Sequence, residues 1–303
     1  MKPEVALIGA QGRIGAAAGT ALIKRGHHVV GLARDPDRPN RRTTPFPVRP
    51  LRLTDPAQLA ADLDDVEVVI YCAGAYHEAV ETIHELAVFE INAIAALRTA
   101  LAAAYVNARR FVYLSSTAVM GRDTDGCAGA YVRSKRLAEQ VLTDTVPIEV
   151  TILRLGWVID PEDEVAYRKL WPPSGRQVIV GDQPVPIVAL SDVANAATLL
   201  ASRDLYGHAD LSGCVDLVVG CPTQEQLYEL ASSLAITPIR VVDAGTVARV
   251  ARLAALRRNM TEAPTWLTQS TPLRKTSWTS FGLTLTSWQD CVRNLWRAQT
   301  VHS

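Results

Sequence analysis

The stretch Val5–Gly15, VALIGAQGRIG, places Gly9, Gly12 and Gly15 three residues apart, directly after a short apolar run. This pattern predicts a strand, a tight turn and the start of a helix. Glycine is needed in such a turn because its backbone angles oppose a Cβ, and because a bulky pyrophosphate must approach the main chain closely. The N–H groups at the start of the helix would then bind the anion. The stretch therefore predicts a nucleotide-binding turn, although small residues also occur in ordinary turns.

The residues that follow continue a βαβ pattern. Ala16–Arg25 is typical of a helix of small residues, Gly26 stands where a left-handed C-cap belongs, and His28–Ala33 is typical of a second strand. Arg34–Pro50 reads as a loop. Further strands are expected to end at Leu51–Leu53 and to span Val66–Cys72, Phe111–Leu114, Glu149–Leu153 and Pro186–Leu190, and further helices to span Pro56–Leu63, Val80–Tyr105, Tyr131–Leu142 and Asp192–Ala201. This alternation favours an α/β fold with a doubly wound parallel sheet of the Rossmann type.

The rhythm changes at about Tyr206. Shorter strands follow, with helices expected at Thr223–Leu234 and Thr246–Arg258, and the tail Trp266–Trp296 is expected to end in a helix. We therefore expect two unequal parts. They are a dinucleotide-binding domain over residues 1–159, completed by about 186–205, and a smaller substrate-binding lobe from residues 160–185 and 206–303.

Length and composition limit the function classes. The 303 residues are 48% hydrophobic, enough for a large core. Basic and acidic residues both number 31, so the basic surface of a nucleic-acid-binding protein is not expected and a small-molecule partner is favoured. No continuous apolar run approaches the roughly 18 residues of a membrane span, and the early first strand leaves no room for a signal peptide. The five scattered cysteines lack a metal-ligand spacing, which favours reduced thiols, no metal and a cytoplasmic location.

Tyr131 and Lys135 are four residues apart, which places both side chains on one face of the expected helix. A lysine cation beside a phenol would lower the pKa of Tyr131 toward the working pH, so that it could exchange a proton with a substrate oxygen. Ser116, at the carboxyl end of an expected strand, could hydrogen-bond the same oxygen, with Thr117 as a possible substitute. These residues are the candidate catalytic group, although YxxxK pairs also occur by chance.

With these features in order, the chain resembles an extended short-chain dehydrogenase/reductase of the NAD-dependent epimerase/dehydratase superfamily. The resemblance covers roughly residues 1–205. It rests on GAQGRIG for the family's GxxGxxG, Ala73-Gly74 after a strand, Asn92 in a helix, Ser115–Gly121 for SSxxxxG, Tyr131–Lys135 for YxxxK, an LRxG-like run at Leu153–Gly156, and a DVA at Asp192–Ala194. The last hundred residues match only in general layout.

The resemblance implies roles for these residues. Tyr131 would be the catalytic acid or base, Lys135 would hold the nicotinamide ribose and tune the tyrosine, and Ser116 would bind the substrate carbonyl. Asn92, Ala73 and Gly74 would line the cofactor. Together with the turn, this gives the expected cofactor-binding set: Gly9, Gln11, Gly12, Arg13, Ile14, Gly15, Arg34, Ala73, Gly74, Asn92, Tyr131 and Lys135.

The expected cofactor is NADP(H), with NAD(H) as the alternative. An NAD enzyme of this type usually ends its second strand with an acid that binds the ribose 2′-hydroxyl, whereas here Ala33 is followed by Arg34, and Arg13 lies in the glycine turn. A guanidinium suits a 2′-phosphate. Arg34 could instead be an ordinary loop residue. Arg52 stands where the family often has an acid that meets the adenine, so adenine recognition stays open.

The expected function is an NADPH-dependent ketoreductase acting on a small-molecule ketone, a natural-product intermediate or a deoxysugar, with Tyr131 as proton donor. His77 and Trp157 could face the substrate, although surface exposure is the simpler explanation of His77 and core packing that of Trp157. One alternative is a nucleotide-sugar epimerase or dehydratase, disfavoured by Ala33 and by Thr117-Ala118 where a dehydratase has an Asp-Glu pair. The other is a non-catalytic NADP(H) sensor, disfavoured by the intact Tyr131 and Lys135. A homodimer is possible.

Overall fold

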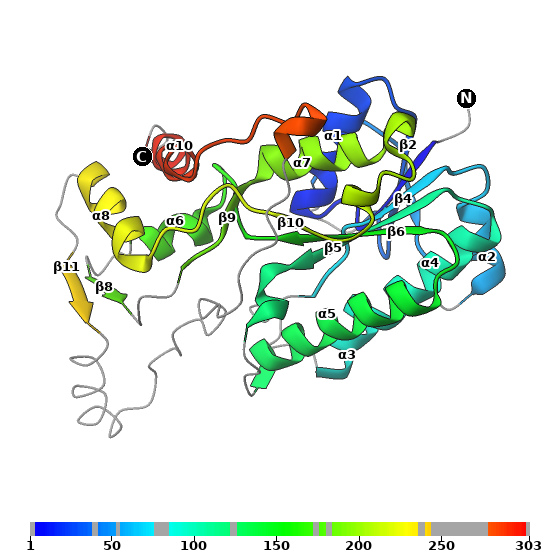
Figure 1. Ribbon diagram of the computed structural model, residues 1–303, viewed down its shortest axis with the longest axis horizontal. Helices are drawn as coiled ribbons and strands as arrows, with labels where there is room; N and C mark the ends of the chain where they lie inside the picture. Colours follow the sequence, from blue (N-terminus) through cyan, green and yellow to red (C-terminus); the bar gives the residue numbers. More distant parts are fainter. Residues whose placement is uncertain are drawn as a thin grey trace.

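The computed structural model describes residues 4–37, 42–52, 55–75, 85–121, 126–171, 176–179, 184–235, 240–243 and 278–300. A seven-stranded parallel sheet forms its centre, in the order β10-β6-β5-β4-β1-β2-β3 (Figure 1). Its strands are β1 (Val5–Ile8), β2 (Val29–Ala33), β3 (Val48–Pro50), β4 (Val68–Tyr71), β5 (Arg110–Ser116), β6 (Glu149–Leu155) and β10 (Gly213–Leu217). The predicted doubly wound α/β fold is therefore confirmed.

Helices cover both faces of this sheet (Figure 1). On one face lie α1 (Arg13–Lys24) and α7 (Leu190–Leu200), over alternate strand residues such as Leu7 and Ile70. The other face, with Ile8 and Tyr71, is covered by α2 (Pro56–Asp62), α4 (Ala95–Tyr105) and α5 (Gly126–Thr145). Successive strand residues point to opposite faces, so the continuous apolar strands are buried on both sides.

A second, smaller cluster of elements lies beyond one end of the sheet (Figure 1). Its core contains Leu170, Ile187, Leu227 and Leu295. None of these four residues lies on a strand of the seven-stranded sheet. Its elements are β7 (Trp157–Ile159), α6 (Glu164–Leu170), β8 (Arg176–Ile179), β9 (Ile187–Ala189), α8 (Gln224–Leu234), β11 (Arg240–Asp243) and α10 (Trp288–Thr300). The predicted helix at Thr246–Arg258 lies outside the described residues.

Three predicted boundaries are wrong. A strand, β3, falls inside the predicted loop Arg34–Pro50, and as the last strand of the sheet it tolerates Pro50, whose missing N–H faces no further neighbour. The strand β10, assigned to the smaller lobe, pairs with β6 in the large sheet. A short 3₁₀ turn, Trp278–Phe281, likewise returns to the large core, where the indole of Trp278 donates to the Asp216 carbonyl at 2.9 Å.

The helix Glu85–Tyr105 combines α3 (Glu85–Phe89), a π-helical turn η2 (Glu90–Ile94) and α4. By length and composition it could cross a membrane, with a mean hydropathy of 1.5. The expectation that no segment reaches this limit is therefore wrong, because alanines keep the average high around Asn92 and Arg98. Half of the apolar window is buried inside the protein, as in core helices of soluble proteins, so the match is weak as a sign of a membrane span.

Candidate functional site

The glycine turn lies where the strand order reverses between β1 and β4. Gly9 has φ +79°, and a Cβ there would lie 2.8 Å from the Ala73 backbone, so only glycine fits. A Cβ on Gly15 would lie 2.4 Å from the Gly9 carbonyl oxygen. The ends of β1 and β4 and the first turn of α1 are thus in direct contact. Crevices at such switch points bind ligands in open α/β sheets.

Two further observations test whether a dinucleotide fits this turn. Gly12 is the N-cap of α1 and offers no side-chain cap, so the first N–H groups of the helix are available to an anion. Gln11 donates through Nε2 to the Pro36 carbonyl at 2.8 Å, whereas its buried Oε1 has no hydrogen-bond partner within the described ranges. A buried acceptor of this kind is satisfied when a ligand donor binds. The turn therefore fits the group that its sequence predicts.

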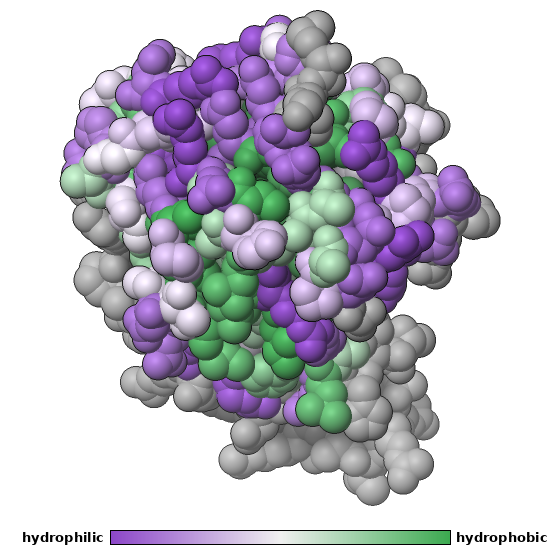
Figure 2. All heavy atoms as spheres, turned by 90° about the vertical axis from the view of Figure 1, so that its right-hand side faces the viewer, coloured by the Kyte–Doolittle hydropathy of each residue, from purple (hydrophilic) through white to green (hydrophobic). Residues whose placement is uncertain are grey.

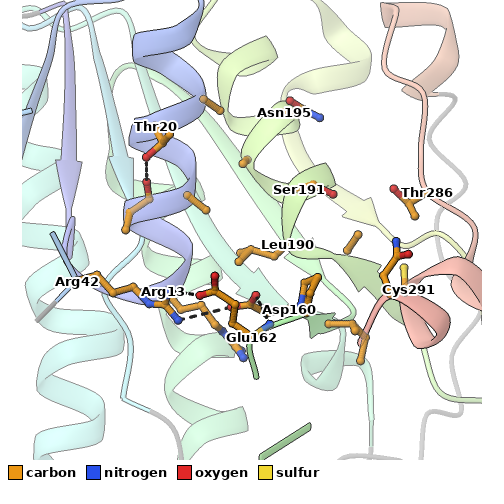
Figure 3. A pocket seen from close by; sticks show the side chains of 18 of the residues that line it. Arg13, Thr20, Arg42, Asp160, Glu162, Leu190, Ser191, Asn195, Thr286 and Cys291 are labelled. Carbon is orange, nitrogen blue, oxygen red and sulfur yellow. Dashed lines mark hydrogen bonds and ion pairs between the residues drawn. The ribbon is translucent and has the colours of Figure 1, made fainter. Parts of the chain in front are cut away.

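The two arginines expected near the adenine ribose differ in their surroundings. Arg34 follows the last residue of β2 and is exposed, and no ion pair of Arg34 occurs within the part of the chain that the structure describes. Arg13 is ion-paired with Asp163, the N-cap of α6 in the smaller lobe. Arg42 lies beside it, 3.6 Å from Asp160 (Figure 3). Arg13 is thus already neutralised, while Arg34 remains available for a 2′-phosphate.

Asn92 supports the turn after β4 rather than projecting freely toward a ligand. Its side chain is fully buried, accepts from the Ala75 N–H at 2.9 Å and donates to Ser134 Oγ at 3.0 Å. It therefore fixes the segment Ala73-Gly74 to helix α5. The π-helical turn frees backbone carbonyls from their usual helical partners, and the hydroxyl of Tyr113 donates to the Asn92 carbonyl at 2.7 Å.

Ser116 and Tyr131 come together as predicted from the sequence. Ser116 is the last residue of β5, Tyr131 lies on α5, and their side chains are hydrogen-bonded. The Ser116 hydroxyl also accepts from the Ala118 N–H at 3.2 Å, which caps a 3₁₀ turn over Thr117–Met120. Two hydroxyl groups therefore meet at the carboxyl edge of the sheet, where one substrate oxygen could contact both.

Lys135 is buried beside this pair. Its Nζ donates to the Leu114 carbonyl at 2.8 Å and lies 4.5 Å from the centre of the Tyr113 ring. A Cβ placed on Gly74 would lie 3.7 Å from Nζ and 3.6 Å from Asn92 Oδ1. The ammonium group, the turn after β4 and helix α5 thus border one small volume, which is where the resemblance expects the nicotinamide ribose.

The pKa values of this group differ from the sequence-based prediction. Burial raises the pKa of Tyr131, and its hydrogen bond with Ser116 opposes the increase only in part. The predicted lowering by Lys135 is therefore not found, because the ammonium is directed at Leu114 and Tyr113. Burial lowers the pKa of Lys135 to about 7, although the charge of Glu139 acts in the opposite direction.

The residues expected to contact substrate are only partly placed. Thr117 is buried directly after Ser116 and opens the 3₁₀ turn. Trp157 opens β7 and packs partly buried against the core of the smaller lobe. His77 lies outside the described residues. Sequence reasoning missed Ser134 and Glu139 on α5; their spacing of three and four residues from Tyr131 and Lys135 was the available signal.

A cavity of about 800 Å³ lies on the outer side of α1 and α7, where both meet the turn 160–162 and α10 (Figure 3). It is lined by residues such as Arg13, Thr20, Arg42, Asp160 and Asn195. None of the predicted catalytic residues contributes to its walls. The cavity is therefore separate from the site formed by Ser116, Tyr131 and Lys135.

A model of the family described as NAD(P)H-binding matches residues 9–200, which include the glycine turn and the YxxxK helix. The chain belongs to this NAD(P)H-binding family. The family segment contains every predicted cofactor and catalytic residue, so the prediction of a nicotinamide-dinucleotide protein is confirmed at this level. No curated protein matches the chain in sequence.

Solved structures with the same fold extend the comparison over the whole chain. MoeE5, solved with UDP-glucuronic acid and NAD, is 20% identical, with a TM-score of 0.74 over 99% of this chain and 100% of its own. TunA, an NAD-dependent NDP-hexosamine 5,6-dehydratase, is 16% identical, with a TM-score of 0.72 over 100% and 99%. The UDP-glucose 4-epimerase of Thermotoga maritima is 16% identical, with a TM-score of 0.72 over 98% and 99%. The predicted resemblance to the epimerase/dehydratase superfamily is thus confirmed in fold.

Proposed function

We propose that this NAD(P)H-binding protein is an NADPH-dependent ketoreductase of the short-chain dehydrogenase/reductase type. The hydrogen bond between Ser116 and Tyr131, beside the buried Lys135, carries the proposal. The bound cofactor would supply the hydride. The glycine turn from Gly9 to Gly15 would hold its pyrophosphate, and the segment Ala73-Gly74, fixed by Asn92, would border its nicotinamide half.

The residues of the site would then bind and protonate the substrate. Ser116 and Tyr131 would both hydrogen-bond the ketone oxygen and orient its carbon toward the cofactor. Because burial raises the pKa of Tyr131, the phenol is protonated at neutral pH and can donate its proton as negative charge develops on that oxygen. Lys135 would hold the nicotinamide ribose, since its ammonium is directed at Leu114 and Tyr113 and not at the phenol. The test is oxidation of NADPH by the purified protein in the presence of small aliphatic, aromatic and deoxysugar ketones.

The preference for NADPH rests on Arg34 and gives a testable contrast with Arg13. We expect Arg34→Gln to weaken NADPH binding about 10- to 100-fold, since a charged hydrogen bond to phosphate contributes roughly 1.5–3 kcal/mol, and to leave NADH binding unchanged. Arg13→Gln is the matched control, expected to change NADPH binding less than about threefold because Asp163 already neutralises Arg13. Both dissociation constants are measured by quenching of tryptophan fluorescence. Equal effects of the two variants would contradict the assignment.

A nucleotide-sugar epimerase or dehydratase is the second candidate. The structural neighbours favour it, since MoeE5 is described with UDP-sugars and NAD and TunA as a dehydratase. Against it stand Ala33, where such NAD enzymes have an acid, and Thr117-Ala118 in place of an acidic pair. Incubation with UDP-glucose and NAD⁺, followed by analysis of the sugar for epimer or dehydrated product, separates the candidates. A ketoreductase leaves the sugar unchanged and consumes NADPH only when a ketone is added.

We also propose that the protein forms a homodimer in a reducing, cytoplasmic environment. Four cysteines, Cys72, Cys214, Cys221 and Cys291, are free thiols in the described parts of the chain. The helical layer of α3–α5 carries exposed large apolar side chains: Leu86, Ile94, Leu101, Tyr105 and Leu137. Hydrophobic residues also form a continuous patch on the face that carries α2 and α4 (Figure 2). A second copy, related by a two-fold axis, would cover such a layer.

Leu101 provides the test of this homodimer. We expect the wild-type protein to elute as a dimer in size-exclusion chromatography with light scattering, and Leu101→Glu to elute as a monomer, because a carboxylate would be buried unpaired at the two-fold interface. Val165→Glu is the control, since Val165 is a similarly exposed apolar residue on α6 of the smaller lobe. A monomeric wild type, or a dimeric Leu101→Glu variant, would exclude dimerisation through this face.

A further inference from the structure

A buried acid on the catalytic helix takes no part in the proposed chemistry. Glu139 is 7% exposed and lies one helical turn after Lys135. Its carboxylate accepts from Ser115 Oγ at 2.6 Å and from Arg154, with Nε at 3.0 Å and Nη2 at 2.6 Å. The thiol of Cys214 lies 3.9 Å away. A buried carboxylate with this many donors is held in one place.

These partners belong to three neighbouring strands. Ser115 lies on β5, Arg154 on β6 and Cys214 on β10, and Ser115 and Arg154 are partners in the sheet register. Glu139 therefore joins α5 to the carboxyl ends of β5 and β6 and to the start of β10 through one group. Ser115 directly precedes Ser116, so the same contact sets the position of Tyr131 relative to Ser116.

Glu139 is also the acid that acts on Lys135. From β5, Lys135 faces the Tyr113 ring and the Leu114 carbonyl; from β4, it faces the thiol of Cys72. On its own helix, Glu139 follows at the i+4 position, where side chains are neighbours. The charge of Glu139 raises the pKa of Lys135 against the larger effect of burial. Arg154 reduces the effect of Glu139 on the pKa of Lys135, because its guanidinium pairs with the same carboxylate.

We infer that Glu139 is a positioning residue: it sets α5 on the strand ends through Ser115 and Arg154, and its negative charge extends to higher pH the range in which Lys135 stays protonated where the nicotinamide ribose is expected. The part that concerns the ribose rests on the proposed function. The part that concerns the charge of Lys135 does not, because it is a property of the protein alone. The two parts can therefore be tested separately.

The first measurement needs no cofactor. The free energy of unfolding in urea is measured from pH 5 to 8.5. In the wild type, the titration of Lys135 makes this free energy rise with pH from about pH 7 upward. In Glu139→Gln, which keeps the shape of the side chain, we expect this rise to begin about one pH unit lower. Ser115→Ala is the matched control, since it removes one hydrogen bond of Glu139 without a change in charge. It should lower stability equally at every pH.

A second variant covers the case in which Glu139→Gln does not fold. Arg154→Gln leaves the carboxylate and removes its cation, so the rise should begin at a higher pH than in the wild type. A purely structural role would make Glu139→Gln and Arg154→Gln less stable without moving the start of the rise. That outcome, or a shift of the same sign in both variants, would overturn the inference.

The second measurement concerns the cofactor. We expect Glu139→Gln to bind NADPH roughly tenfold more weakly than the wild type at pH 8 and nearly as well at pH 5, where Lys135 is charged in both proteins. Ser115→Ala should show the same change in NADPH affinity between the two pH values as the wild type. If the wild type binds no dinucleotide, the proposed function fails while the unfolding measurement still decides the charge of Lys135. If it binds NADPH but Glu139→Gln shows no pH dependence, the role of Glu139 toward the cofactor is excluded.

Discussion

Tyr131→Phe is expected to lower kcat for ketone reduction by a factor of 10² to 10⁴, the usual contribution of a general acid or base. Burial raises the pKa of the phenol, so it is protonated at neutral pH, and Ser116 holds it where it could donate this proton to the developing alkoxide. Phenylalanine keeps the ring on α5 and removes only the hydroxyl. Turnover is measured as NADPH oxidation at saturating ketone.

Binding separates this chemical role from damage to the fold. We expect the dissociation constant of NADPH for Tyr131→Phe to stay within about threefold of the wild-type value, since the other proposed cofactor contacts are untouched. Tyr105→Phe, at a tyrosine that is 81% exposed on α4, serves as the control for loss of a phenol. Retention of more than about a tenth of the wild-type kcat by Tyr131→Phe would show that another group donates the proton.

Lys135→Met is expected to change how stability depends on pH. Burial lowers the pKa of Lys135 to about 7 from an ordinary value of 10.5, so between these values the unfolded chain binds a proton that the folded protein does not. The free energy of unfolding therefore rises with pH in this window, by at most about 1.4 kcal/mol per unit. Between pH 7 and 8.5 this amounts to roughly 2 kcal/mol, which Lys135→Met should lose.

The upper end of the measured range is set by other groups. Burial raises the pKa of Cys72 to about 12 from an ordinary value near 9. Above about pH 9 the unfolded chain therefore loses the thiol proton that the folded protein keeps, and the free energy of unfolding falls as pH rises. Urea unfolding at pH 6, 7, 8 and 8.5 avoids it. Lys24→Met, at an exposed lysine at the end of α1, should keep the wild-type slope. An unchanged slope in Lys135→Met would mean that Lys135 is not the titrating group.

The glycine turn and the pair of Tyr131 and Lys135 were predictable because each depends on local geometry. A positive φ at Gly9 and the left-handed Gly26 that ends α1 are requirements of the backbone, and they leave a mark in the residue type itself. The i, i+4 spacing likewise brings Tyr131 and Lys135 onto one face of any helix. The position of Ser116 followed from the apolar run before it, which ends where β5 ends.

The electrostatic state of the site was not predictable in this way. Spacing suggested that Lys135 lowers the pKa of Tyr131, whereas burial raises it, and burial depends on every element packed around the phenol. The pairing of Arg13 with Asp163 joins residues 150 positions apart and redirects one of the two arginines expected at the cofactor. No pattern in the sequence indicates which distant acid a guanidinium will meet.

The sequence by itself determined the family, the doubly wound parallel class of the sheet and the residues able to do chemistry, because these depend on backbone angles, on apolar runs and on short spacings. The tertiary structure decided the rest: the return of β10 and Trp278 to the large sheet, the partner of Arg13, and the buried carboxylate of Glu139 beside Lys135. These features depend on which distant surfaces pack together and on how far water is excluded between them. Neither the packing of distant surfaces nor the exclusion of water between them can be read from neighbouring residues.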